Sequence, residues 1–433
     1  MRSKLLALPL FCLTLHAEVK VLKNFTLIDG NGGAPAANAA MIVNNGRIEW
    51  IGPVAQLKTP AGAEVVDLSG KYVMPGIIDL HTHLGATVDL TQSADNLTEK
   101  NVENDLKTYA SYGVTSVLSM GTDKDFVIGM RNKQRNGRPG ETRIFTAGHG
   151  FIYTGGYGGL AGVNTGVSTK AEVDGQVAQL AAQKVDIVKL WLDDHLGEQK
   201  KMPYDIAKAI IDDAHKNKLT AAAHIFYLAD AKQLVNDGVN GLAHSVRDKP
   251  IDQELIDSMK KHGTWQMAAT LSREASMFVY AQTPPFAADP FFMRGVSANV
   301  ATTLKSANHQ KTMAADPHFA HYREFLDTAE KNLKKLADAG VKFGMGTDSG
   351  PPGRFPGYFE HWEMELMVEA GLTPSQVIQA ATKNAAEFLK AKDLGALEKL
   401  KWADLIVLGK NPLDDIKNTR TIEAVYIAGN RVK

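Results

Sequence analysis

The sequence predicts an α/β protein: a (β/α)8 TIM barrel that carries a small β-sandwich domain formed by both chain ends. Three observations predict this fold. Short apolar runs alternate with helical patterns along the middle of the chain, which is typical of parallel βα units. Eight such runs occur, the number that closes a barrel. The polar residues of these runs gather at their C-terminal ends, where barrel enzymes place their active sites.

The first residues, 1–17, are typical of a secretory signal peptide. Arg2 and Lys4 precede the apolar run "LLALPLFCLTL", and "LHA" follows before Glu18. This run of eleven apolar-biased residues is shorter than the roughly 20 that span a bilayer. We therefore expect cleavage near Ala17, a secreted or periplasmic protein, and no membrane contact after cleavage. The alternative is that the run forms a buried first element of the fold.

The only cysteine, Cys12, lies inside this leader. The mature protein would therefore contain neither disulfides nor thiolate metal ligands, and any metal ion would be held by nitrogen and oxygen atoms.

Both ends of the mature chain share a pattern of short strands separated by Gly and Asn turns. It is seen in "VKVLKNFTLIDG" and "AAMIVNNGRIEWIGP", and again in "WADLIVLG" and "TIEAVYIAGNRVK". We expect residues 18–73 and 400–433 to pair into one β-domain, with residues 74–399 forming the barrel. The segment 275–325 is longer than a plain βα connection. It is either a lid over the substrate or a structural insertion.

The charge balance argues for a small-molecule partner. The 48 Lys and Arg residues equal the 48 Asp and Glu residues, so no overall field favours nucleic acid or an anionic membrane. Assembly with further copies of this chain is left open.

One set of polar side chains lies at the predicted strand ends. In "VMPGIIDLHTHLG" two histidines stand two residues apart, so both point to the same face of the strand. Four further strands end in a candidate ligand of their own. Alone, each of these histidines could be a hydrogen-bonded core residue, but together, without a thiolate, the set suits Zn²⁺ or a similar divalent transition ion. The set comprises His81, His83, Lys189, His224, His244 and Asp348.

Ordered motifs extend this pattern along the chain: "PGIIDLHTH", "IVKLW", "AAAHIF", "GLAHS", "GTDSG", "AATKNAAEFL" and "KWADLIVLGKNPLDDI". With them the chain resembles the amidohydrolase superfamily, in particular its binuclear metallo-dipeptidase, prolidase-like and imidazolonepropionase-related branch. The resemblance implies two divalent metal ions. His81, His83 and Asp348 would bind one ion and His224 and His244 the other.

The same resemblance implies that Lys189 bridges both ions as a carbamate formed with CO₂. A lysine in a largely apolar strand has a depressed pKa, so its neutral amine can react. The alternative is an ordinary ammonium group paired with Asp193 or Asp348.

The implied activity is hydrolysis of an amide C–N bond in a small substrate such as a dipeptide or N-acyl amino acid. A hydroxide held between the ions would attack the carbonyl, with Asp348 as general acid and base. In "TGGYGG" Tyr157 stands where metallo-dipeptidases usually have a histidine. His149 and Tyr227 are therefore candidates for polarising the carbonyl, and Tyr157 and Arg354 for binding substrate.

Two other functions stay open. One is a mononuclear deaminase or a cyclic-amide hydrolase similar to imidazolonepropionase. Deaminases of the superfamily usually have a glutamate soon after the strand-five histidine, and "HIFYLADAKQLVNDG" lacks one. The other is a secreted relative without catalysis, which would be expected to lose metal ligands. None is missing here.

Overall fold

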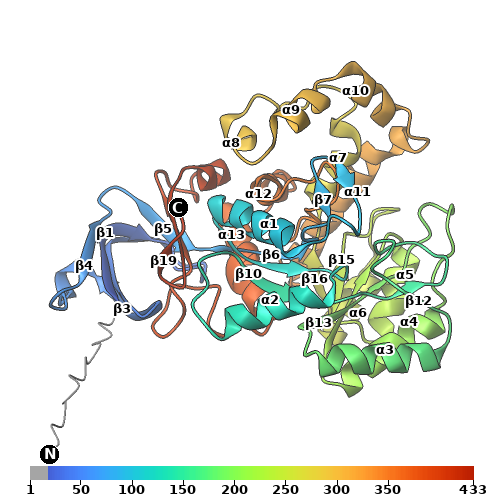
Figure 1. Ribbon diagram of the computed structural model, residues 1–433, viewed down its shortest axis with the longest axis horizontal. Helices are drawn as coiled ribbons and strands as arrows, with labels where there is room; N and C mark the ends of the chain where they lie inside the picture. The colour runs from blue at the N-terminus through green and yellow to red at the C-terminus, as the bar shows by residue number, and fades with distance from the viewer. Residues whose placement is uncertain (1–17) are drawn as a thin grey trace, which may run out of the picture.

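A computed structural model describes residues 18–433, and one eight-stranded mixed sheet joins the two ends of this range (Figure 1). The strand order is β19-β18-β17-β5-β1-β2-β3, with β4 paired in parallel to β1. Asn45 and Gly46 both have positive φ, which suits the tight turn between β2 and β3. The strands are β1 (Val19–Leu27), β2 (Ala36–Asn44), β3 (Arg47–Pro53), β4 (Glu64–Asp67), β5 (Tyr72–Pro75), β17 (Leu405–Leu408), β18 (Ile422–Ile427) and β19 (Asn430–Arg431).

The predicted α/β core begins immediately after β5 in the chain. Gly76 connects β5 to the first core strand, and a side chain there would lie 2.1 Å from Thr115 Oγ1. The core strands pair in parallel, and their buried, apolar composition is typical of strands covered on both faces. They are β6 (Ile77–Thr82), β9 (Val114–Ser119), β10 (Arg143–Thr146), β13 (Ile187–Trp191), β14 (Thr220–His224), β15 (Gly241–Ala243) and β16 (Trp265–Ala268).

The prediction of a closed barrel of eight regular strands needs correction. The core strands form two sheets, β10-β9-β6 and β13-β14-β15-β16, and the eighth predicted run, 342–350, is not a regular strand. That run still joins the two sheets, because Gly344 N donates to Gln266 O and Leu80 N donates to Met345 O. At Asp348 the backbone turns to φ 61°, which ends the extended conformation that a ladder requires.

Helices cover the outside of the core strands. Each buries an apolar stripe; α3, for example, buries Val173, Val177 and Leu180. The helices are α1 (Glu99–Ser111), α2 (Asp125–Arg135), α3 (Lys170–Ala182), α4 (Tyr204–Lys216), α5 (Leu228–Asn236), α6 (Gln253–His262), α11 (Phe319–Asp338), α12 (Tyr358–Glu369), α13 (Pro374–Gln379) and α14 (Ala385–Phe388). Within residues 18–433, every helix is too short or too polar to serve as a transmembrane span.

The predicted insertion is helical. It comprises α7 (Leu271–Val279), α8 (Pro290–Met293), α9 (Ala298–Leu304) and α10 (Ala307–Ala314), and α8 to α10 lie together at the top of Figure 1. Asp89 lies between β7 (Thr87–Val88) and β8 (Thr91–Gln92), and its carboxylate accepts hydrogen bonds from Ser297 and Asn299. The insertion is therefore tied to the loop that follows β6.

Candidate metal centre

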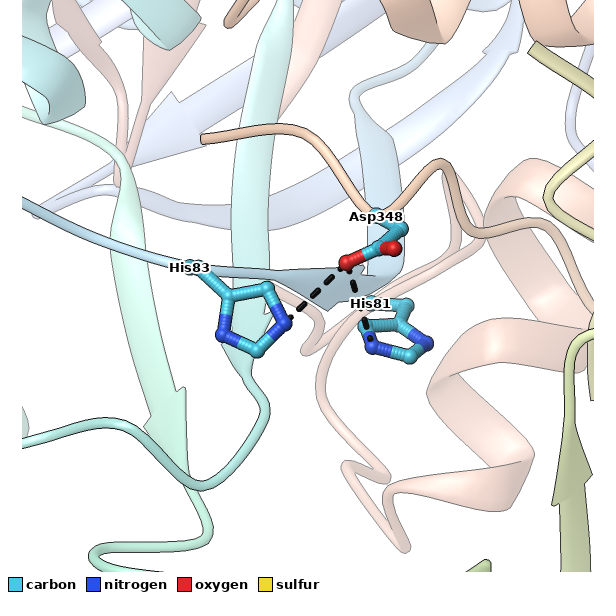
Figure 2. A group of neighbouring side chains, drawn as sticks. All are labelled: His81, His83 and Asp348. Carbon is cyan, nitrogen blue, oxygen red and sulfur yellow. Dashed lines mark ion pairs between the residues drawn. The ribbon is translucent and has the colours of Figure 1, made fainter. Parts of the chain in front are cut away.

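His81, His83 and Asp348 come together at the end of β6 (Figure 2). Each offers one ligand atom, and the three atoms lie within 4.8 Å of one another. Asp348 Oδ1 is 3.1 Å from His83 Nε2 and 3.6 Å from His81 Nε2. All three side chains are buried. The His-x-His pair on one strand face thus meets the carboxylate from the irregular eighth segment, as the sequence predicts.

His224 and His244, at the ends of β14 and just past β15, join the same cluster. Their ring centroids are 4.2 Å apart, and the His244 ring is 4.9 Å from that of His81. His224 Nε2 pairs with Asp193 Oδ2 at 2.7 Å, and His244 Nδ1 pairs with Thr270 Oγ1 at 2.7 Å. Each ring therefore keeps one nitrogen for another partner: Nδ1 of His224 and Nε2 of His244.

Lys189 is fully buried in β13, with its Nζ 3.4 Å from His81 Nε2 and 4.7 Å from the ring centroid of Trp191. No carboxylate of residues 18–433 lies within 4.0 Å of this nitrogen, so neither Asp193 nor Asp348 forms the ion pair of the alternative interpretation. Burial lowers the pKa of Lys189 to about 7. A substantial fraction of the amine is therefore neutral near neutral pH.

The cluster opens into a cavity of about 300 Å³. Tyr157 and Arg354, the two predicted substrate-binding residues, both line it. Among the described residues, its lining includes nothing from α8, α9 or α10. The lining consists of His81, His83, Gln92, Thr122, Gly156, Tyr157, Gly158, Gly159, Trp191, Gln199, His224, His244, Asp348, Pro351 and Arg354.

The two residues predicted to polarise a carbonyl lie elsewhere. The Tyr227 hydroxyl donates to Asp194 Oδ1 at 2.8 Å, and Lys201 lies over its ring. His149 is half-buried beside Phe151, with ring centroids 6.5 Å apart. Neither is in the lining of the cavity that holds the histidines.

Asp348 is ionised in this setting. Burial raises the pKa of its carboxyl, but the charge of Arg354 and the hydrogen bond with His83 more than offset this effect and hold the pKa well below its usual range. Arg354 binds Oδ2 of Asp348, which leaves Oδ1 directed at the two histidines.

Three residues around the cluster have a left-handed backbone. His244, Thr270 and Asp348 have φ of 68°, 57° and 61°. Such values are uncommon outside glycine and persist where the surrounding structure enforces them. Here they turn the chain where strands end, and they direct His244 and Asp348 into the cavity.

The residues present fit a divalent metal ion. Burial, the largest cause in each case, lowers the pKa of all four imidazoles, that of His224 to about 4. Neutral imidazoles are the form that binds a metal. Four neutral imidazoles and one carboxylate form a donor set that suits Zn²⁺ and similar ions.

Sequence reasoning missed the partners that orient these rings. Thr122 pairs with His83 Nδ1 at 2.8 Å, as Thr270 does with His244 and Asp193 with His224. These residues follow β9, β16 and β13, so their place just past predicted strands was an available signal. Arg273, in α7, also approaches Asp348, with Nε 3.6 Å from Oδ2. No motif marked it.

Comparison with known proteins supports the resemblance seen in the sequence. The profile of the Amidohydrolase family matches residues 72–432. The chain is 24% identical to the ochratoxinase of Aspergillus niger over 462 residues, covering 95% of this chain and 85% of that one. It is 23% identical to the imidazolonepropionase of Streptomyces avermitilis over 396 residues, covering 88% and 83%.

Solved structures show the same fold. The crystal structure of A. niger ochratoxinase has a TM-score of 0.75 at 20% identity, covering 96% of both chains. A Xaa-Pro dipeptidase with bound methionine in its active site has a TM-score of 0.74 at 21% identity, covering 96% of this chain and 99% of that one.

Proposed function

The chain belongs to the amidohydrolase family, and from this premise we propose that it hydrolyses an amide bond in a small substrate such as a dipeptide or an N-acyl amino acid. One observation carries the proposal. The triad of His81, His83 and Asp348 lies against a cavity of about 300 Å³ that His224 and His244 also line. This volume is at the lower end of the range for small-molecule sites.

Two divalent ions, Zn²⁺ being the best match to the donor set, would be held by these residues. His81, His83 and Asp348 would bind one, and Nδ1 of His224 and Nε2 of His244 the other. When bound, such ions polarise a carbonyl and lower the pKa of water. Lys189 would connect the two groups of ligands as a carbamate. Its complete burial, its pKa of about 7 and its position 3.4 Å from His81 support this role.

Asp348 would move the proton. Its carboxylate is ionised, so it can accept a proton from the attacking water and deliver it to the leaving nitrogen. Arg354 holds Oδ2 and thereby fixes the orientation of Oδ1. Tyr157 lines the cavity, whereas Tyr227 and His149 do not, so we assign contact with the substrate to Tyr157.

A second candidate is hydrolysis of a cyclic amide at a single ion. It is supported by the compact triad, which could hold one ion without Lys189, and by the similarity to imidazolonepropionase. The two candidates differ in metal stoichiometry.

The test is a screen of zinc-loaded protein against dipeptides, N-acyl amino acids and cyclic amides, with metal content measured by elemental analysis. We expect two ions per chain and turnover of a linear amide. One ion with ring opening of a cyclic amide would favour the second candidate. Bound metal without any turnover would contradict both.

A further inference from the structure

Two buried acids, Asp79 of β6 and Glu360 of α12, lie close to the candidate metal centre but outside its cavity. Both side chains are fully withdrawn from solvent. Within residues 18–433, neither carboxyl group is paired with a basic side chain. A buried charge without a partner is costly, so a pair of this kind persists only where other contacts satisfy it.

The two acids are close enough to share a proton. Thr347 Oγ1 is 2.6 Å from Asp79 Oδ2 and 3.3 Å from Glu360 Oε1. Burial raises the pKa of both carboxyl groups, and the charge of Glu360 raises that of Asp79 further. Glu360 Oε2 is buried and has no hydrogen-bond partner among the described residues. A proton held between the two carboxyl groups satisfies this oxygen and removes one of the two charges.

This acid pair holds the residues on both sides of Asp348. Thr347 Oγ1 donates to Asp79 Oδ2, and Thr347 N donates to Asp79 Oδ1 at 3.2 Å. On the other side, Ser349 Oγ donates to Glu360 Oε1 at 2.8 Å. Thr347 and Ser349 are both fully buried. Each neighbour of Asp348 is therefore fixed by a carboxyl group from another element of the fold.

The backbone of Asp348 needs this support. Its φ of 61° lies in the left-handed region, which is unfavourable outside glycine and persists where the surroundings enforce it. Asp348 N donates to His81 O at 2.7 Å, and His83 N donates to Ser349 O at 2.8 Å. Asp79 Oδ1 also accepts from His81 N at 2.7 Å. The acid pair thus connects the turn at Asp348 to the strand that carries both histidines.

Tyr109 of α1 adds a third element to this network. Its hydroxyl lies 2.7 Å from Ser349 Oγ. Because Ser349 donates its own proton to Glu360, Tyr109 is the donor in this contact. Hydrogen bonds in such a buried chain strengthen one another, and the Ser349 side chain is held from two directions.

We propose that Glu360 is a positioning residue for Asp348. With Asp79 it fixes the two neighbours of Asp348 and so holds the left-handed turn that directs Oδ1 toward the histidines of β6. Glu360 itself does not line the cavity. The inference rests on contacts within this chain, and only its kinetic readout depends on the proposed function.

Three substitutions in α12 separate positioning from a general loss of stability. Glu360→Gln keeps an oxygen that accepts from Ser349 and supplies an N–H in place of the shared proton. Glu360→Met has a similar size but removes both. Glu365→Met is the matched control, because Glu365 is also buried and its carboxylate contacts Arg420 instead.

Crystal structures of the metal-free proteins give the first readout. Asp348 Oδ1 is 3.1 Å from His83 Nε2, and we expect this contact to be kept in Glu360→Gln and in Glu365→Met. In Glu360→Met the turn should relax and the contact should be lost. Tyr109→Phe removes one hydrogen bond to Ser349 and should give a smaller shift, so it serves if the methionine variant does not fold. An unmoved Asp348 in these variants would overturn the inference, whatever their activity.

Zinc affinity and turnover give two further readouts. By chelator competition we expect zinc affinity to fall roughly 10- to 100-fold in Glu360→Met and to be retained in Glu360→Gln and Glu365→Met. At saturating zinc, kcat should fall in Glu360→Met while KM is retained, because the lining of the cavity is unchanged. Equal losses in Glu360→Met and Glu365→Met would mean a general effect on α12 and would contradict positioning. If the wild type cleaves no amide while Asp348 still shifts in Glu360→Met, the proposed function fails and the positioning role stands.

Discussion

Asp193 Oδ2 lies 2.7 Å from Nε2 of His224, so the ring is left with Nδ1 for a metal ion. Asp193 follows β13 and His224 ends β14, two neighbouring strands of one sheet. A carboxylate on the far nitrogen of a metal-binding histidine fixes the orientation of the ring and raises its basicity.

The first prediction concerns this contact. Asp193→Asn removes the negative charge but keeps the shape of the side chain. We expect metal affinity to fall about 10- to 100-fold, with the fold retained. A chelator competition titration measures the affinity. Asp194→Asn is the matched control, because that carboxylate contacts Tyr227 and Lys201 instead. Equal losses in both variants would mean that the effect is general to the loop.

Lys189 distinguishes a two-ion from a one-ion site. In Lys189→Ala we expect the metal content to fall from two ions toward one and hydrolysis to be lost, because the carbamate can no longer form. Added bicarbonate or a short carboxylate should not restore the wild-type rate, since the lysine stem no longer positions it. Elemental analysis gives the stoichiometry. Two ions and full activity in this variant would show that Lys189 is not the bridge.

Asp348→Asn tests the proton transfer. The amide retains an oxygen ligand but cannot accept the proton, so we expect most of the metal to remain while kcat falls by roughly 10²- to 10⁴-fold. Metal content and kcat are measured on the same preparation. A near-normal kcat would remove Asp348 from the role of general base.

The buried side chain of His361 lies outside the metal centre, and we expect it to make the stability of the fold depend on pH. Its Nε2 donates to the carbonyl oxygen of Tyr112 at 2.8 Å, and burial lowers its pKa to about 3. Because the unfolded state binds the proton more readily, this residue destabilises the fold as pH falls from about 6.5 toward 3. By pH 5.5 the loss amounts to about 1.4 kcal/mol.

Urea unfolding of the metal-free protein at pH 7.5 and 5.5 measures this effect. The drop in stability between the two pH values should be smaller in His361→Gln than in the wild type. His262→Gln, at an exposed histidine in the last turn of α6, should leave the drop unchanged. An unchanged drop in His361→Gln would contradict the prediction.

Export is the remaining prediction. Residues 1–17, which include Cys12, lie outside the residues that the structure describes, so the prediction of a signal peptide rests on the sequence. We expect N-terminal sequencing of protein recovered from the periplasm or medium to begin near Glu18. Recovery of chains that start at Met1 would refute cleavage.

The sequence was sufficient to place His81, His83, His224, His244 and Asp348 in one cluster. Alternation along strands and the common end of parallel strands are rules that need no detailed loop structure. The shape of the eighth segment was not predictable in this way, because no sequence pattern indicates the left-handed backbone of Asp348.

The substrate-binding residues, in contrast, could not be identified from the positions of the strand ends. Tyr157 and Tyr227 both stand near predicted strand ends, yet only Tyr157 lines the cavity. Tyr157 lies in the glycine-rich loop "TGGYGG", and the path of that loop brings it to the cavity. Arg273 was missed because it lies in α7 and reaches Asp348 only through the turn at Thr270.

The terminal sheet sets an order of events during synthesis. Strands β1 to β5 leave the ribosome early, but β5 pairs with β17, which is made almost last. Until then the edge of β5 has no partner, and exposed strand edges invite pairing with other chains. The terminal sheet can therefore be completed only when the final residues have been made.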